Sequence, residues 1–148
     1  MAKVFIIIGS KSDMEYAEKC AAQLAVFQID SDLKVSSAHR HPEQTKEYIK
    51  QAEKDGYQVI IAMAGLSAAL PGVVAAHSLL PVIGVPLPAA LGGMDALLSV
   101  TQMPPGIPVA AVAIGSPGAK NAAVLAARIL ALNDEQVKQA LIEHRNSL

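Results

Sequence analysis

Continuous apolar runs alternate with segments of helical spacing along this chain. The first run, Val4 to Ile8, is β-branched and aromatic and ends at Gly9, which is typical of a central strand buried on both faces of a parallel sheet. Apolar residues then recur at helical spacing from Met14 to Phe27, and residues 12–15 fit the S-x-x-E capping box. The pattern predicts a strand followed by a helix that begins at this box.

The same alternation continues to the end of the chain. It predicts a weaker strand near 31–35 and then a helix from Pro42 to about Asp55, closed by Gly56. Further strands are predicted over 59–64, 81–86 and 109–114, with an apolar segment up to His77 after the first of them. Helices are predicted over 121–132 and 134–146. Strands alternating with helices imply right-handed crossovers and a parallel sheet. We therefore expect one α/β domain over residues 1–148: a three-layer, doubly wound, five-stranded, flavodoxin-like sheet of order 2-1-3-4-5 with an added C-terminal helix.

Composition narrows the classes of partner. The 148 residues are 52% hydrophobic, enough for one core, and 12 basic and 13 acidic residues leave a net charge of −1 without a basic block. The balanced charge disfavours a nucleic-acid surface. No run of apolar residues is long enough to cross a membrane, so we expect a cytoplasmic protein.

Two further expectations come from the composition. The high apolar content favours a homo-oligomer. The single cysteine, Cys20, is interpreted as a small core residue.

The loops after the strands are where chemistry is expected. In a doubly wound sheet, ligands bind beyond the carboxyl ends of the strands, near the point where the strand order reverses. This rule selects residues 9–13, 36–41, 65–70 and 86–94.

The first of these loops combines a glycine, two hydroxyls and a helix N-terminus. Free amides from Gly9 to Ser12 favour an anion such as a phosphate, whereas the structural alternative is helix capping by Ser12 alone. The carboxylate of Asp13 would repel a phosphate but can accept hydrogen bonds from ribose hydroxyls. Ser10 and Asp13 together therefore suit a nucleotide-like ligand.

The second loop concentrates Ser36, Ser37, His39, Arg40 and His41 in a chain with only four histidines. An arginine can hold a phosphate or a carboxylate with two parallel hydrogen bonds, and a histidine can exchange a proton near neutral pH. We interpret this loop as functional.

Other features carry weaker predictions. His77 and His144 are assigned structural or surface roles, and no spacing of His, Cys, Asp or Glu resembles a metal site, so no metal is expected. The small, apolar loop over residues 64–72 either approaches a ligand closely or is only a tight turn. The connector over residues 86–93 could cover a site or contact a neighbouring subunit, and 102–108 is a similar connector.

Six short segments, in this order along nearly the whole chain, resemble the N5-carboxyaminoimidazole ribonucleotide mutase family of purine biosynthesis, often called PurE. They are residues 9–13 (GSKSD), 37–40 (SAHR), 70–72 (LPG), 84–86 (GVP), 102–104 (QMP) and 121–123 (NAA). The resemblance implies an octamer of flavodoxin-like subunits that moves a carboxylate from the exocyclic nitrogen of an aminoimidazole ribonucleotide to C4 of the ring, with CO2 as the transferred group and no cofactor.

The resemblance also implies roles for individual residues. Ser10 and Asp13 would bind the ribose phosphate end of the substrate, Ser37 and Arg40 would hold its phosphate or carboxylate, and His39 would transfer the proton. Further substrate contacts are expected from the neighbouring residues of the same loops: Gly9, Ser12, Gly65, Ser67 and Leu70.

The third loop departs from the mutase pattern. Mutases carry Gly-Gly-Ala-Ala-His before the Leu-Pro-Gly, whereas this chain has Gly-Leu-Ser-Ala-Ala over residues 65–69 and lacks that histidine. A serine at this place resembles the related carboxylase class, which takes free CO2, but that class has lysine at the position of Arg40. The mutase is favoured, and the carboxylase stays open.

Non-catalytic modules on the same fold form a second class of function. A receiver-type module would want acidic residues at the end of the first strand, where this chain has Ile7 and Ile8. A flavin-binding module would want aromatic partners, which are scarce at 3%. A non-catalytic protein that binds aminoimidazole ribonucleotide remains as the alternative.

Overall fold

The computed structural model describes residues 1–148, and its centre is one parallel sheet. The strands are β1 (Lys3–Ile8), β2 (Asp30–Val35), β3 (Val59–Ala64), β4 (Val82–Pro86) and β5 (Ala110–Ala111), in the order β2-β1-β3-β4-β5. The register places Ile6 beside Leu33 of β2 and Ile61 of β3. The predicted doubly wound sheet and its strand order are confirmed.

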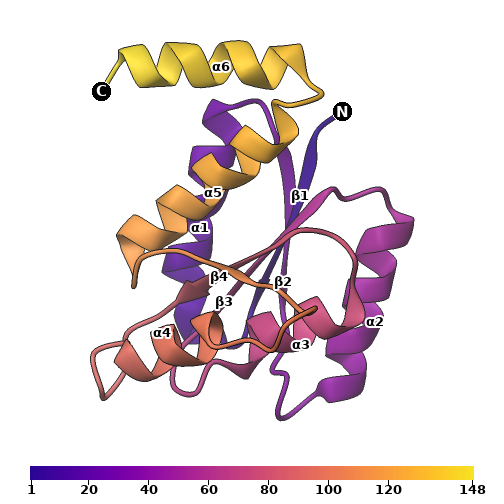
Figure 1. Ribbon diagram of the computed structural model, residues 1–148, viewed down its shortest axis with the longest axis vertical. Helices are drawn as coiled ribbons and strands as arrows, with labels where there is room; N and C mark the ends of the chain where they lie inside the picture. The colour runs from indigo at the N-terminus through magenta and orange to yellow at the C-terminus, as the bar shows by residue number, and fades with distance from the viewer.

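Helices cover both faces of the sheet (Figure 1). One face carries α1 (Met14–Val26) and α5 (Ser116–Leu130). The other face carries α2 (Pro42–Lys54), α3 (Ala69–His77) and α4 (Met94–Thr101). The added helix α6 (Glu135–Asn146) packs against α5 and lies across its end.

The core divides into two clusters because successive residues of a strand point to opposite faces. Ile6 and Ile8 pack toward α1 and α5, while Ile7 packs toward α2, α3 and α4. This explains why β1, β3 and β4 are continuous apolar runs. Cys20 of α1 is fully buried in the first cluster, in agreement with its interpretation as a small core residue. This burial raises the pKa of its thiol to about 12.

The start of the first helix differs from the prediction. Ser12 and Glu15 form no capping box; instead a short 3-10 turn, Lys11–Asp13, precedes α1. Ser10 is extended (φ −150°, ψ 152°), so its Oγ accepts a hydrogen bond from the backbone N–H of Ser12 at 3.3 Å. The side-chain cap therefore belongs to the 3-10 turn, and α1 itself begins after Asp13 without a side-chain cap.

The last third of the chain contains three further corrections. The strand predicted over 109–114 is regular only at Ala110–Ala111, since it is an exposed edge that pairs with β4 alone. The helix predicted over 121–132 begins at Ser116, where Pro117 suits a first turn, and ends at Leu130. Helix α4 was not predicted, because its eight residues lie between two glycine- and proline-rich connectors.

Candidate functional site

An open cavity of about 410 Å³ lies beyond the carboxyl ends of β1, β2 and β3 and beside the segment after β4. It is lined by 17 residues, and they include every residue predicted to belong to the site: Gly9, Ser10, Ser12, Asp13, Ser37, His39, Arg40, Gly65, Ser67 and Leu70. Loops far apart in sequence meet here because the strands before them are parallel neighbours. The volume is within the range of about 300–1,000 Å³ that is usual for small-molecule sites.

The first wall is the turn between β1 and α1. The backbone N–H of Gly9 donates to the carbonyl of Met63 at 3.2 Å, which joins this turn to the end of β3. Ser10 Oγ accepts from both the backbone N–H and the Oγ of Ser12, at 3.3 and 3.0 Å. The two hydroxyls are thus held together at the edge of the cavity.

The second wall is the turn between β2 and α2. Ser36 is buried, and its Oγ shares a 2.7 Å hydrogen bond with Thr45 Oγ1 of α2. This bond fixes the turn to the first part of that helix. Ser37 Oγ accepts from the backbone N–H of Arg40 at 3.1 Å. The side chains of His39 and Arg40 are exposed and make no hydrogen bond within the chain, so both are free for a ligand.

The third wall is the loop between β3 and α3. Gly65 accepts a hydrogen bond at its carbonyl from the N–H of Ala68 at 2.9 Å, which closes a tight turn. Leu66 and Ala68 have left-handed backbone, with φ of 52° and 27°. Ser99 of α4 donates its Oγ to the carbonyl of Ser67 at 2.6 Å. This loop is therefore held in a strained conformation by a residue from another element.

Asp13 is the one carboxylate of the cavity. Partial burial raises the pKa of its carboxyl above the ordinary value, and a hydrogen bond with the Ser10 backbone offsets this in part. Its ionised form is therefore poorly solvated and is well placed to accept hydrogen bonds from ligand hydroxyls.

Some residues singled out by sequence do not line the cavity. Ser36 and His41 belong to the second loop but contribute no lining, and Ser36 acts through Thr45 instead. His77 is exposed at the end of α3, and His144 packs edge-on against the Phe27 ring with centroids 5.1 Å apart. Both fit the structural or surface roles assigned to them.

The fourth wall is the connector after β4, which the sequence selected as a range without assigning any of its residues to the site. Pro88 and Ala89 of this connector line the cavity. Their position directly after a strand indicated a possible role. The sequence predicted that this connector either covers a site or contacts a neighbouring subunit. Ser99 could not be identified from the sequence, because no pattern in its own helix indicates a contact with residue 67.

Two further observations describe the whole chain. No group of three or more His, Cys, Asp or Glu side chains is placed to hold a metal ion. None of the helices is both long enough and apolar enough to span a membrane.

Comparison with known proteins gives matches over the full chain. The AIR carboxylase family profile matches residues 3–148. The N5-carboxyaminoimidazole ribonucleotide mutase of Pyrococcus abyssi is 51% identical over 149 residues, covering 100% of this chain and 84% of the relative. The enzyme of the same name from Escherichia coli K12 is 48% identical, covering 99% and 87%.

A solved structure agrees with these relatives. The crystal structure of Treponema denticola PurE superposes with a TM-score of 0.91 at 36% identity, covering 99% of this chain and 91% of that chain. The family profile, the relatives and the fold agree with one another. This chain belongs to the AIR carboxylase family.

Proposed function

We propose that this protein is an N5-carboxyaminoimidazole ribonucleotide mutase, an isomerase that moves a carboxylate from the exocyclic nitrogen to C4 of the imidazole in purine biosynthesis. The observation that carries the proposal is the meeting of His39, Arg40 and the Ser10 turn in one cavity. Identity of about half over the full chain to proteins named as this mutase supports the same reaction.

Different walls of the cavity suit the two ends of the substrate. The hydroxyls of Ser10 and Ser12 and nearby backbone amides suit the phosphate, and Asp13 accepts hydrogen bonds from the ribose hydroxyls. Arg40, beside Ser37, holds the substrate's phosphate or carboxylate through its guanidinium. Gly9, Gly65 and Leu70 shape the wall around the ring.

His39 carries the proton. In the first step the bond between the exocyclic nitrogen and its carboxylate breaks, CO2 leaves, and the imidazolium of His39 protonates the nitrogen. C4 of the resulting aminoimidazole then attacks the retained CO2, and the neutral imidazole takes the proton from C4. One proton is given and one is taken back, so the reaction balances without a cofactor.

The third loop retains the CO2. Proximity makes recapture of a trapped molecule faster than its escape. Ala64, Ala68 and Leu70 form a buried apolar floor there. Ser67 occupies the loop that differs from the mutase pattern, and its carbonyl is fixed by Ser99.

The source of the carboxylate is tested by isotope labelling. The purified protein is incubated with the N-carboxylated ribonucleotide in ¹³C-bicarbonate, and the mass of the C4-carboxylated product is measured. We expect unlabelled product, at a rate independent of bicarbonate. Product formed only from aminoimidazole ribonucleotide plus bicarbonate, and fully labelled, would replace the mutase with the carboxylase. Calorimetric binding without turnover in either assay would instead identify a non-catalytic binding protein.

We also propose that the protein works as a homo-octamer, as the family resemblance implies. Met94 and Leu98 lie one turn apart on α4, and Leu91 lies in the connector before it; each is more than half exposed. Exposed large apolar side chains close together in the chain are typical of a surface that a partner covers. Sedimentation velocity tests this proposal, since a monomer at micromolar concentration would contradict it.

A further inference from the structure

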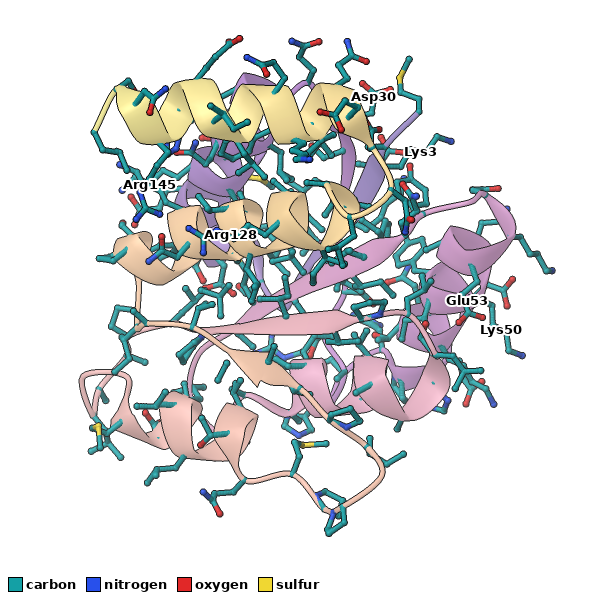
Figure 2. The ribbon with its side chains drawn as sticks, turned by 45° about the horizontal axis from the view of Figure 1, so that its top comes forward. Lys3, Asp30, Lys50, Glu53, Arg128 and Arg145 are labelled. Atoms are coloured by element: carbon teal, nitrogen blue, oxygen red, sulfur yellow. The ribbon has the colours of Figure 1, made fainter.

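A second cavity, of about 330 Å³, lies between α1, α5 and α6 and shares no residue with the first. Its lining includes the cationic or titratable side chains Lys120, Arg128, His144 and Arg145 and the amides Gln23 and Asn121. Figure 2 shows Arg128 on α5 and Arg145 on α6 on the same side of the molecule, far from Lys50 on α2. We call this cavity the basic cleft.

The charge of the basic cleft is one-sided. The chain has 13 acidic side chains, but none of them lines this cavity. Lys138 with Glu135 is the one ion pair of the structure, so none of the three permanent cations of the cleft, Lys120, Arg128 and Arg145, is paired. A concave surface with several unpaired cations is an attractive site for an anion.

The two helices direct these side chains by their spacing. Lys120 and Arg128 are eight residues apart on α5, so they share one face of that helix, and His144 and Arg145 follow each other in the last turn of α6. Contact of α6 with α5 brings the two sets together. The ring of His144 packs edge-on against Phe27, which holds one side of the cleft in place.

Stabilisation of helix ends explains only part of this cluster. Arg128, His144 and Arg145 lie in last turns, where a cation interacts favourably with the helix dipole. Lys120, the fifth residue of α5, lies past the first turn and far from the C-terminal end, so stabilisation of a helix end does not explain it. The amides of Gln23 and Asn121 add neutral hydrogen-bond donors that the dipole does not require.

We propose that the basic cleft binds a small anion that carries two or more phosphate groups, at a site separate from the mutase cavity. Two guanidinium groups can each bind phosphate oxygens with parallel hydrogen bonds, and the lysine adds a point charge. Arg128 and Arg145 come from different helices, so each can bind a separate phosphate group of one di- or triphosphate, whereas a single phosphate would use only part of the site. The cleft is large enough for such a group.

The test uses inorganic tripolyphosphate as the probe, titrated into the full chain by isothermal calorimetry at low and physiological salt. We expect a binding site for the probe that is weakened at least about tenfold in the double variant Arg128→Gln/Arg145→Gln, and by a smaller factor in Lys120→Gln. The matched control is Lys50→Gln/Lys54→Gln, which removes the same charge from α2, and should bind within about twofold of wild type.

Arg40→Gln separates the two cavities. Under the proposal this variant keeps tripolyphosphate binding, because Arg40 lies in the other cavity. The proposal is overturned if wild type does not bind the probe, if binding is lost in Arg40→Gln but kept in the cleft variant, or if the α2 control loses as much affinity. Equal binding of citrate would overturn selectivity for phosphate. A changed oligomer size in the cleft variant, without binding by wild type, would identify a subunit interface instead.

Discussion

The hydroxyl of Ser99, on α4, donates a 2.6 Å hydrogen bond to the main-chain carbonyl of Ser67, thirty-two residues earlier in the loop after β3. The same hydroxyl lies 3.4 Å from the carbonyl of Ala68. The residues on either side of Ser67 have left-handed backbone, which is unfavourable for any residue with a Cβ. The conformation of the loop therefore depends on a contact with α4, and we call Ser99 a positioning residue.

Replacement of Ser99 tests this dependence. We expect Ser99→Ala to lower kcat on the order of tenfold, because small displacements of a positioned group are costly in turnover, with a smaller change in KM. The free energy of unfolding should fall by about 1 kcal/mol, as for one lost hydrogen bond. Ser99→Thr keeps the hydroxyl and should recover most of the turnover. Steady-state kinetics and chemical denaturation measure both effects.

A matched control lies one half-turn along the same helix. Thr101 Oγ1 donates only within α4, to the carbonyl of Leu97 at 2.8 Å. Thr101→Ala should therefore leave kcat unchanged at a similar cost in stability. Equal loss of kcat in the two alanine variants would show that α4 acts through its stability and not through Ser67.

His39 is expected to be essential for turnover. His39→Asn keeps a polar side chain of similar shape but cannot exchange a proton near neutral pH, so kcat should fall by at least about 100-fold while substrate binding stays measurable by calorimetry. His41→Asn is the control, since His41 is exposed in the same loop but outside the cavity lining. Retained turnover in the His39 variant would remove this residue from the mechanism.

The raised pKa of Asp13 predicts a pH dependence of stability. In the folded protein the carboxyl keeps its proton above the ordinary value of 3.8, so over that range the folded state binds more protons than the unfolded state. The free energy of unfolding must then fall as pH rises through this window. Asp13→Asn removes the titration, and its Tm advantage over wild type should grow from pH 3.5 toward neutrality. An advantage that shrinks over this range would refute the assigned direction.

Replacement by alanine should affect two helical glycines differently. A Cβ at Gly118 of α5 would overlap the carbonyl of Ala113, so Gly118→Ala should destabilise the fold by about 2 kcal/mol. At Gly72 of α3 the nearest atom is the flexible Met103 sulfur at 3.2 Å. There the gain in helix propensity, about 1 kcal/mol, offsets the contact. The free energy of unfolding of both variants is measured by urea denaturation. A larger loss in Gly72→Ala than in Gly118→Ala would contradict this prediction.

Much of the site could be predicted because its residues are local in sequence. Each predicted residue lies within a few positions of a strand end, and parallel strands bring such ends to one edge of the sheet. The His39-Arg40 pair was recognisable from its side chains alone. Pro88 and Ala89 lie in a connector that the sequence selected only as a range, and Ser99 was not recognisable, because its importance comes only from what it contacts.

The sequence by itself determined the α/β alternation, the buried strands and the loops that carry chemistry, because hydrophobic period and turn residues are properties of neighbouring positions. Tertiary structure decided the rest. It inserted a 3-10 turn capped by Ser10 before α1, shortened the edge strand at Ala110, joined Ser99 to Ser67 and brought Arg128 beside α6. These features depend on contacts between segments distant in the chain, and such contacts are set by packing, which no local pattern encodes.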